Sequence, residues 1–88
     1  MKAADPAAYS DIAEITTSVA LNKPFRGLII VPTTLAATVT FTLTTIAGAT
    51  RTGLTFIIPA NQTYILPIAG NNITVTAASN VTKIYAVI

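Results

Sequence analysis

In the stretch ATVTFTLTT, residues Ala37 to Thr45, apolar and hydroxyl-bearing residues alternate strictly as far as Thr44. A period of two is typical of a β-strand that buries one face, and β-branched threonine suits that conformation. We expect the core-facing side chains to be Val39, Phe41 and Leu43. We expect the outward side chains to be Thr38, Thr40, Thr42 and Thr44. This outward face would carry four hydroxyls and no charge, whereas soluble sheets usually protect themselves with charge.

Short runs of similar character lie before and after this stretch, separated by Pro, Gly and Asn. The runs are Glu14–Leu21, Arg26–Val31, Leu54–Pro59, Gln62–Ile68, Asn72–Ala77 and Val81–Ile88. Strands at a spacing of about 8–12 residues indicate an all-β sandwich or barrel. We therefore expect a small antiparallel β-sandwich or barrel of six to seven strands over residues 14–88, with an extended N-terminal arm over residues 1–13.

The composition fits one small, weakly charged domain. Hydrophobic residues make up 52% of the 88 residues and charged residues 9%, against about 25% charged in typical domains. Disorder is excluded, because it requires low hydrophobicity and high charge. Polar residues interrupt every apolar run before it reaches the length of about 18 residues that a membrane span needs. The N-terminus lacks the apolar segment of a signal peptide, so we expect synthesis in the cytoplasm.

The charges are divided unevenly along the chain. Residues 1–14 hold one lysine and three carboxylates, a net charge of −2, whereas residues 15–88 hold four cations and no carboxylate, a net charge of +4. Two interpretations remain open: sparse solvating charge, or an acidic arm that meets a basic body of its own chain or a neighbour. The cations form no basic stripe, so we expect no nucleic-acid partner. They are Lys23, Arg26, Arg51 and Lys83.

The residue types needed for catalysis are largely missing from the sequence. There is no histidine or cysteine, so neither an imidazole base nor a thiol nucleophile is present. The three carboxylates are Asp5, Asp11 and Glu14, all in or beside the predicted arm. Paired acids across a cleft and hard-metal sites both need more carboxylates than the predicted domain offers. We expect no enzymatic activity, no cofactor and no metal.

The threonine-bearing face allows three interpretations. It is a solvated sheet face, a surface that contacts protein, or a water-ordering array such as an ice-binding module would use. Protein contact costs little desolvation there, because no lysine has to leave water. Carbohydrate binding is a related alternative, although the chain offers three tyrosines and no tryptophan for stacking on sugars. A functional-amyloid subunit is disfavoured by five prolines and by the regular turns.

Four segments in this order resemble the small spike-base or decoration proteins of tailed phages and gene transfer agents. The segments are ALNKPFRGLIIV (20–31), TVTF (38–41), FIIPANQTYILPI (56–68) and ITVTAASNVTKIYAVI (73–88). The sequence departs from those proteins at three places: Asn61 stands where they tend to have glycine after Pro-Ala, TAASN (76–80) replaces a glycine-centred turn, and VPTTLAA (31–37) replaces a glycine-containing turn after the second strand. The resemblance implies a non-enzymatic virion component, present in many copies and docked on a capsid or supporting a spike or fibre.

These observations together predict a homo-oligomer of roughly three to six copies that also binds the major capsid protein or other virion proteins. Its site of action would be the virion. Twelve extended arm residues span about 40 Å, enough to reach a neighbouring subunit, although a frayed terminus is the alternative. The predicted interface residues are Pro6, Tyr9, Asp11, Arg26, Thr38, Thr40, Thr42, Thr44 and Arg51.

Overall fold

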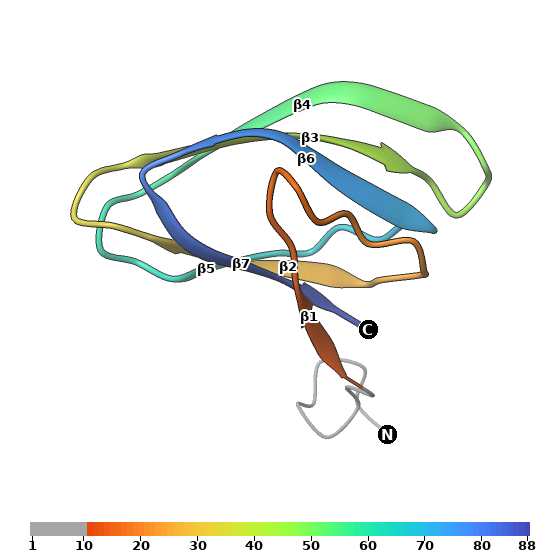
Figure 1. Ribbon diagram of the computed structural model, residues 1–88, viewed down its shortest axis with the longest axis horizontal. Helices are drawn as coiled ribbons and strands as arrows, with labels where there is room; N and C mark the ends of the chain where they lie inside the picture. Colours follow the sequence, from red (N-terminus) through yellow and green to blue (C-terminus); the bar gives the residue numbers. More distant parts are fainter. Residues whose placement is uncertain (1–10) are drawn as a thin grey trace.

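A computed structural model describes residues 11–88, which form a sandwich of two antiparallel sheets (Figure 1). The strands are β1 (Ile12–Glu14), β2 (Gly27–Pro32), β3 (Ala37–Thr44), β4 (Thr50–Ile58), β5 (Tyr64–Leu66), β6 (Asn72–Ser79) and β7 (Val81–Val87). One sheet has the order β1-β7-β2-β5 and the other β4-β3-β6. The predicted all-β sandwich of six to seven strands is confirmed. Of the predicted arm, residues 1–10 lie outside the described residues.

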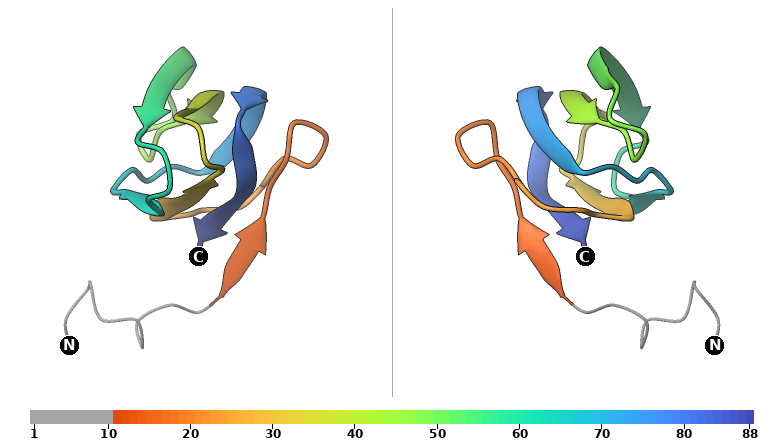
Figure 2. Two further views of the ribbon diagram at one scale, coloured as in Figure 1. Left: turned by 90° about the vertical axis from the view of Figure 1, so that its left-hand side faces the viewer. Right: turned by 90° about the vertical axis from the view of Figure 1, so that its right-hand side faces the viewer.

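The two sheets are stacked as layers (Figure 2). The chain crosses between them after β2, β4, β5 and β6, and the last crossing is the tight turn from β6 to β7. The turn between these strands contains Asn80 with φ 58°. Asparagine is one of the few side-chain-bearing residues that tolerate this left-handed conformation. The Asn80 side chain also donates a hydrogen bond of 3.2 Å to the carbonyl oxygen of Ala36, directly before β3. The turn is therefore bonded to the segment that connects β2 with β3.

The core lies between the layers and follows the predicted alternation of β3. Val39 and Phe41 are fully buried and Leu43 nearly so. The ring of Phe41 stacks on that of Phe56 with centroids 5.4 Å apart, an arrangement that adds to simple burial. The opposite sheet contributes Leu28, Ile30, Leu66, Ile84 and Ala86. On β4, Ile58 is buried, whereas Leu54 and Phe56 are only partly covered.

Backbone hydrogen bonds around Gly70 hold the two layers together at one end. Phe25 and Gly70 exchange backbone hydrogen bonds of 2.9 and 3.1 Å, and the next amide, of Asn71, donates to the carbonyl oxygen of Thr44 at 2.8 Å. A Cβ at position 70 would lie 2.6 Å from that Thr44 oxygen. Glycine is required here because the backbone of β3 approaches too closely for any side chain.

The predicted strand at Glu14–Leu21 is largely wrong. Strand β1 covers Ile12–Glu14, and its first two residues, predicted to belong to the arm, pair with Val87 and Ala86 of β7. The chain then makes a tight turn, in which the hydroxyl of Thr16 accepts hydrogen bonds from the amides of Ser18 and Val19 at 3.1 Å each. Threonine followed by small polar residues offers the backbone this local alternative to a strand.

Candidate interaction surfaces

The outer side of the three-stranded sheet is what we call the threonine face. Register places outward-facing residues of β4 and β6 on both sides of the β3 threonines. The face comprises Thr38, Thr40, Thr42, Thr44, Thr50, Thr55, Ile57, Asn72, Thr74, Thr76, Ala77 and Ser79. None of these side chains carries a charge. The structure thus brings together the four predicted β3 threonines and adds uncharged neighbours from both adjacent strands.

Part of the hydroxyl capacity of the threonine face is used within the sheet. The hydroxyls of Thr40 and Thr55 lie 3.0 Å apart across the β3–β4 ladder, and that of Thr76 donates to the carbonyl oxygen of Thr40 at 3.2 Å. Both ladders of β3 are irregular, between Thr40 and Phe41 towards β6 and between Phe41 and Leu43 towards β4. Such bulges bend and twist a sheet. This geometry disfavours the flat hydroxyl array that an ice binder would need.

The outer side of the four-stranded sheet has a different character, and we call it the aliphatic face. One register row crosses all four strands, in the order Glu14, Tyr85, Ile29 and Ile65. Ile12 lies at one end of the face and Val31 at the other. The face therefore comprises Ile12, Glu14, Ile29, Val31, Ile65, Lys83 and Tyr85.

Several apolar side chains of the aliphatic face are open to solvent. Ile65 is 60% exposed and Ile12 is 45% exposed, while Ile29, Val31 and Tyr85 are half-buried. Burying apolar area contributes roughly 25 cal/mol per Å², so covering these residues would stabilise a complex. The sequence did not single out Ile12, Ile29 or Ile65. Ile29 and Ile65 lie in runs that are apolar on both sides, which do not reveal the residues that point outward, and Ile12 was predicted to belong to the arm.

One ion pair borders the aliphatic face. The ammonium of Lys83 lies 3.1 Å from a carboxylate oxygen of Glu14, and both side chains are about half-exposed. The hydrogen bond to Glu14, and then its negative charge, raise the pKa of Lys83 above the usual value for lysine. Glu14 belongs to the acidic N-terminal part of the sequence and Lys83 to the basic remainder. One contact of the predicted acidic–basic kind therefore exists within the chain itself.

The other predicted interface residues are dispersed. Pro6 and Tyr9 lie outside the described residues. The carboxylate of Asp11 accepts a hydrogen bond of 2.8 Å from the amide of Ile12, at the start of β1. Arg26 precedes β2 and its guanidinium donates to the carbonyl oxygen of Ile88 at 3.5 Å. Arg51 is exposed on β4, in the other sheet. The structure does not bring the two arginines into one patch.

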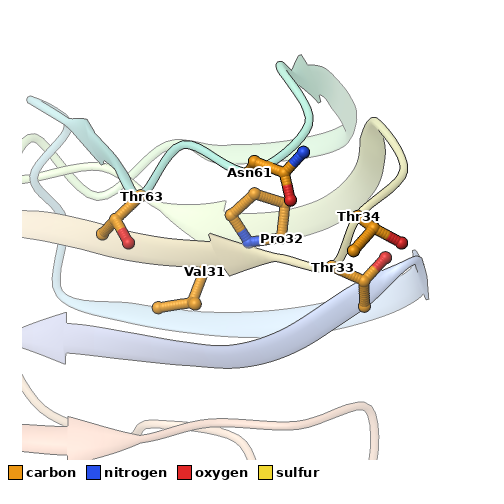
Figure 3. A pocket seen from close by; sticks show the side chains of 6 residues that line it. All are labelled: Val31, Pro32, Thr33, Thr34, Asn61 and Thr63. Carbon is orange, nitrogen blue, oxygen red and sulfur yellow. The ribbon is translucent and has the colours of Figure 1, made fainter.

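A hollow of about 430 Å³ lies where the end of β2 meets the loop that precedes β5. Figure 3 shows Pro32 at its centre, with Asn61 above it and threonine side chains on both sides. The lining residues are Val31, Pro32, Thr33, Thr34, Asn61 and Thr63. None of them has an ionisable side chain, so the hollow offers hydroxyl, amide and aliphatic contacts but no acid, base or nucleophile.

Within residues 11–88, no group of three or more acidic, histidine or cysteine side chains is placed to hold a metal ion. In the same part of the chain, no helix is long and apolar enough to cross a bilayer. Comparison of the chain with protein-family models, with curated proteins and with solved structures finds no match. A functional proposal therefore rests on the surfaces described above and on the resemblance seen in the sequence.

Proposed function

We propose that this chain is a non-enzymatic structural protein that acts as a homo-oligomer in a phage virion, of the capsid decoration, cement or spike-base type. The observation that carries the proposal is the aliphatic face, where Ile12 and Ile65 stand exposed beside half-buried apolar neighbours. Large continuous apolar patches are uncommon on monomeric proteins and mark interaction sites. The virion role is supported by the sequence resemblance.

The low charge of the outer surfaces supports the same proposal. The threonine face carries no charge, and the aliphatic face carries the Glu14–Lys83 pair. Uncharged surfaces can be covered without removing ions from water, which is a large cost in any interface. Virion components of this size act through many symmetric contacts, so each contact can be weak.

Two asparagines stand in turns where the resembling proteins tend to have glycine, and their backbone conformations are ones that glycine also adopts. Asn61 has φ 60° and Asn80 has φ 58°. Both angles are in the left-handed region that glycine adopts most readily and asparagine next. Asparagine at these two places therefore preserves the turn geometry that glycine would give.

Purified virions and two matched variants test the proposal. Mass spectrometry of purified tailed phage virions, produced in cells that express this chain, should find the chain in many copies per virion. Ile65→Lys should reduce its incorporation and its self-association by at least about tenfold, which corresponds to 1.4 kcal/mol. Ile46→Lys is the matched control, because Ile46 is 66% exposed but lies in the β3–β4 turn. Absence from particles, together with unchanged self-association of Ile65→Lys, would contradict the proposal.

A further inference from the structure

Strand β4 is the open edge of the three-stranded sheet. Among the described strands its hydrogen-bonded neighbour is β3 alone, so its other side presents unpaired backbone N–H and C=O groups. It is the longest described strand, with nine residues, and its single charged residue is Arg51. A long edge of low charge is a template for pairing with another strand.

The other described edges are protected in ways that β4 is not. Strands β1 and β5 have three residues each, and β5 is followed directly by Pro67. Very short edges and proline both limit further pairing. On β6, Ile73 exchanges two backbone hydrogen bonds of 3.0 Å with Leu21. Within residues 11–88, β4 is therefore the longest edge strand, and neither a strand nor an isolated bridge pairs with its outer side.

The pairing-competent part of β4 is bounded on both sides. On one side is Gly53, with φ 65°, next to the irregularity in the β3–β4 ladder. On the other is Pro59, which has no amide to donate. Between them, residues 54–58 form a regular ladder with β3. Within this segment Ile57 is 73% exposed, and Phe56 is only half-buried although it faces the core.

We propose that residues 54–58 of β4 pair antiparallel with the same residues of a second copy, about a two-fold axis at Phe56. This inference rests on the proposed homo-oligomeric function and names one of its contacts. In this register Phe56 meets Phe56, Leu54 meets Ile58 and Thr55 meets Ile57. The three-stranded sheets of the two copies then become one continuous six-stranded sheet.

A second copy fits this edge better than a charged partner does. Directly opposed aromatic and aliphatic residues stabilise an antiparallel pair, and residues 54–58 offer no charge to a foreign acidic or basic segment. The two Arg51 side chains lie at opposite ends of the paired segment. Each is five residues from the axis, so they are about 34 Å apart at 3.4 Å per residue, beyond the screening length of about 8 Å. Pro59 falls opposite Gly53, where the ladder ends.

This contact is small and defines a symmetry. The surface area buried by pairing five residues is smaller than the roughly 1,200–2,000 Å² that a stable interface buries. The β4 pairing therefore acts together with a further contact, such as one through the aliphatic face. A two-fold axis also requires an even number of subunits in any closed assembly built from it. The proposal therefore predicts an even multiple of the chain mass.

Cysteine pairs test the register, because the chain contains no cysteine of its own. Thr55→Cys mixed with Ile57→Cys places the two thiols directly opposite, with Cβ atoms about 5 Å apart. We expect the mixture to form disulfide dimers at least about tenfold faster than either variant alone, because like residues lie on the diagonal and beyond disulfide reach. Thr74→Cys, exposed on the same outer face, is the control. A mixture that reacts no faster than Thr74→Cys contradicts the proposal.

A charge-swap pair tests the contact without cross-linking. Thr55→Lys with Ile57→Lys sets lysines opposite each other and should weaken association at least about tenfold. Thr55→Lys with Ile57→Glu sets opposite charges face to face and should restore association. If wild type assembles and both double variants assemble equally well, the β4 contact is wrong while the proposed function stands. A wild-type monomer at every concentration up to about 1 mM contradicts both.

Discussion

The two sheets share one core but present different outer surfaces. The threonine face satisfies part of its polarity internally, through the Thr40–Thr55 hydroxyl pair and the Thr76 contact to the β3 backbone. The aliphatic face leaves Ile12 and Ile65 exposed beside the Glu14–Lys83 ion pair. Both faces lack strong charge, but the large exposed apolar side chain of the threonine face is Ile57 at its β4 edge, whereas the aliphatic face has apolar side chains on all four strands, whose burial would drive association. Absence of charge permits a contact, whereas exposed apolar area stabilises it.

The largest expected effect is on the free energy of unfolding, and it distinguishes a core residue of β3 from an outward-facing residue of the same strand. Phe41 is fully buried and stacks on Phe56, so Phe41→Ala should lower the free energy of unfolding by about 3–5 kcal/mol. Thr38 is exposed on the same strand, and Thr38→Ala should cost less than about 1 kcal/mol. Chemical denaturation measures both changes. Equal small effects would mean that the faces of β3 are reversed.

The second prediction concerns the backbone contacts of Gly70 that hold the two layers together. Gly70→Ala places a Cβ against the carbonyl oxygen of Thr44 and should destabilise the fold by about 1–3 kcal/mol. At Gly27 the nearest atom to an added Cβ is 3.6 Å away. Gly27→Ala should therefore be neutral or stabilise by up to about 1 kcal/mol. Thermal denaturation of the two variants should shift in opposite directions or by clearly different amounts, and a harmless Gly70→Ala would show that the layers separate freely there.

Lysine substitutions on the two outer faces compare how much each face contributes to self-association. We expect Ile65→Lys to weaken self-association at least about tenfold, because it puts a charge in the apolar area that a neighbour covers. Thr42→Lys should leave the fold intact and have a smaller effect on self-association. Sedimentation of the two variants under identical conditions measures the difference. The reverse order would make the threonine face the main interface, as the sequence alone favoured.

The smallest expected effect concerns the ion pair beside the aliphatic face. Glu14 raises the pKa of Lys83, so the pair stabilises the folded state at neutral pH. That contribution is lost as the pH rises through the folded-state pKa, which is raised above the ordinary value for lysine. The difference in Tm between wild type and Lys83→Met should therefore shrink at strongly alkaline pH. A difference that grows with pH would show that the pair does not stabilise the fold.

The β3 alternation predicted its core-facing residues correctly, because a period of two is informative where each face has its own chemistry. Prediction failed at residues 15–21, where β-branched residues indicated a strand but the Thr16 hydroxyl capped a turn. The same period of two also identified the β3 threonines as the outward-facing residues. The aliphatic face was missed, since GLIIV and YIL are apolar on both sides and their orientation depends on the opposite sheet.

The open edge of β4 also lay beyond sequence reasoning. The order of strands in each sheet decides which strand is an edge, and that order is set by how the layers pack. The ion pair between Glu14 and Lys83 is a related case. The uneven distribution of charge indicated an acidic–basic contact, but only the β1–β7 register shows that Glu14 and Lys83 meet within one chain.

The mass of the purified chain in solution tests the central claim most directly. Light scattering over a concentration series should give a discrete species whose mass is an even multiple of the 9.1 kDa chain. That result would agree with a subunit whose apolar face and open edge are covered by other copies. A 9.1 kDa monomer at every concentration would contradict the proposed self-assembly, and a closed trimer would contradict the two-fold contact through β4.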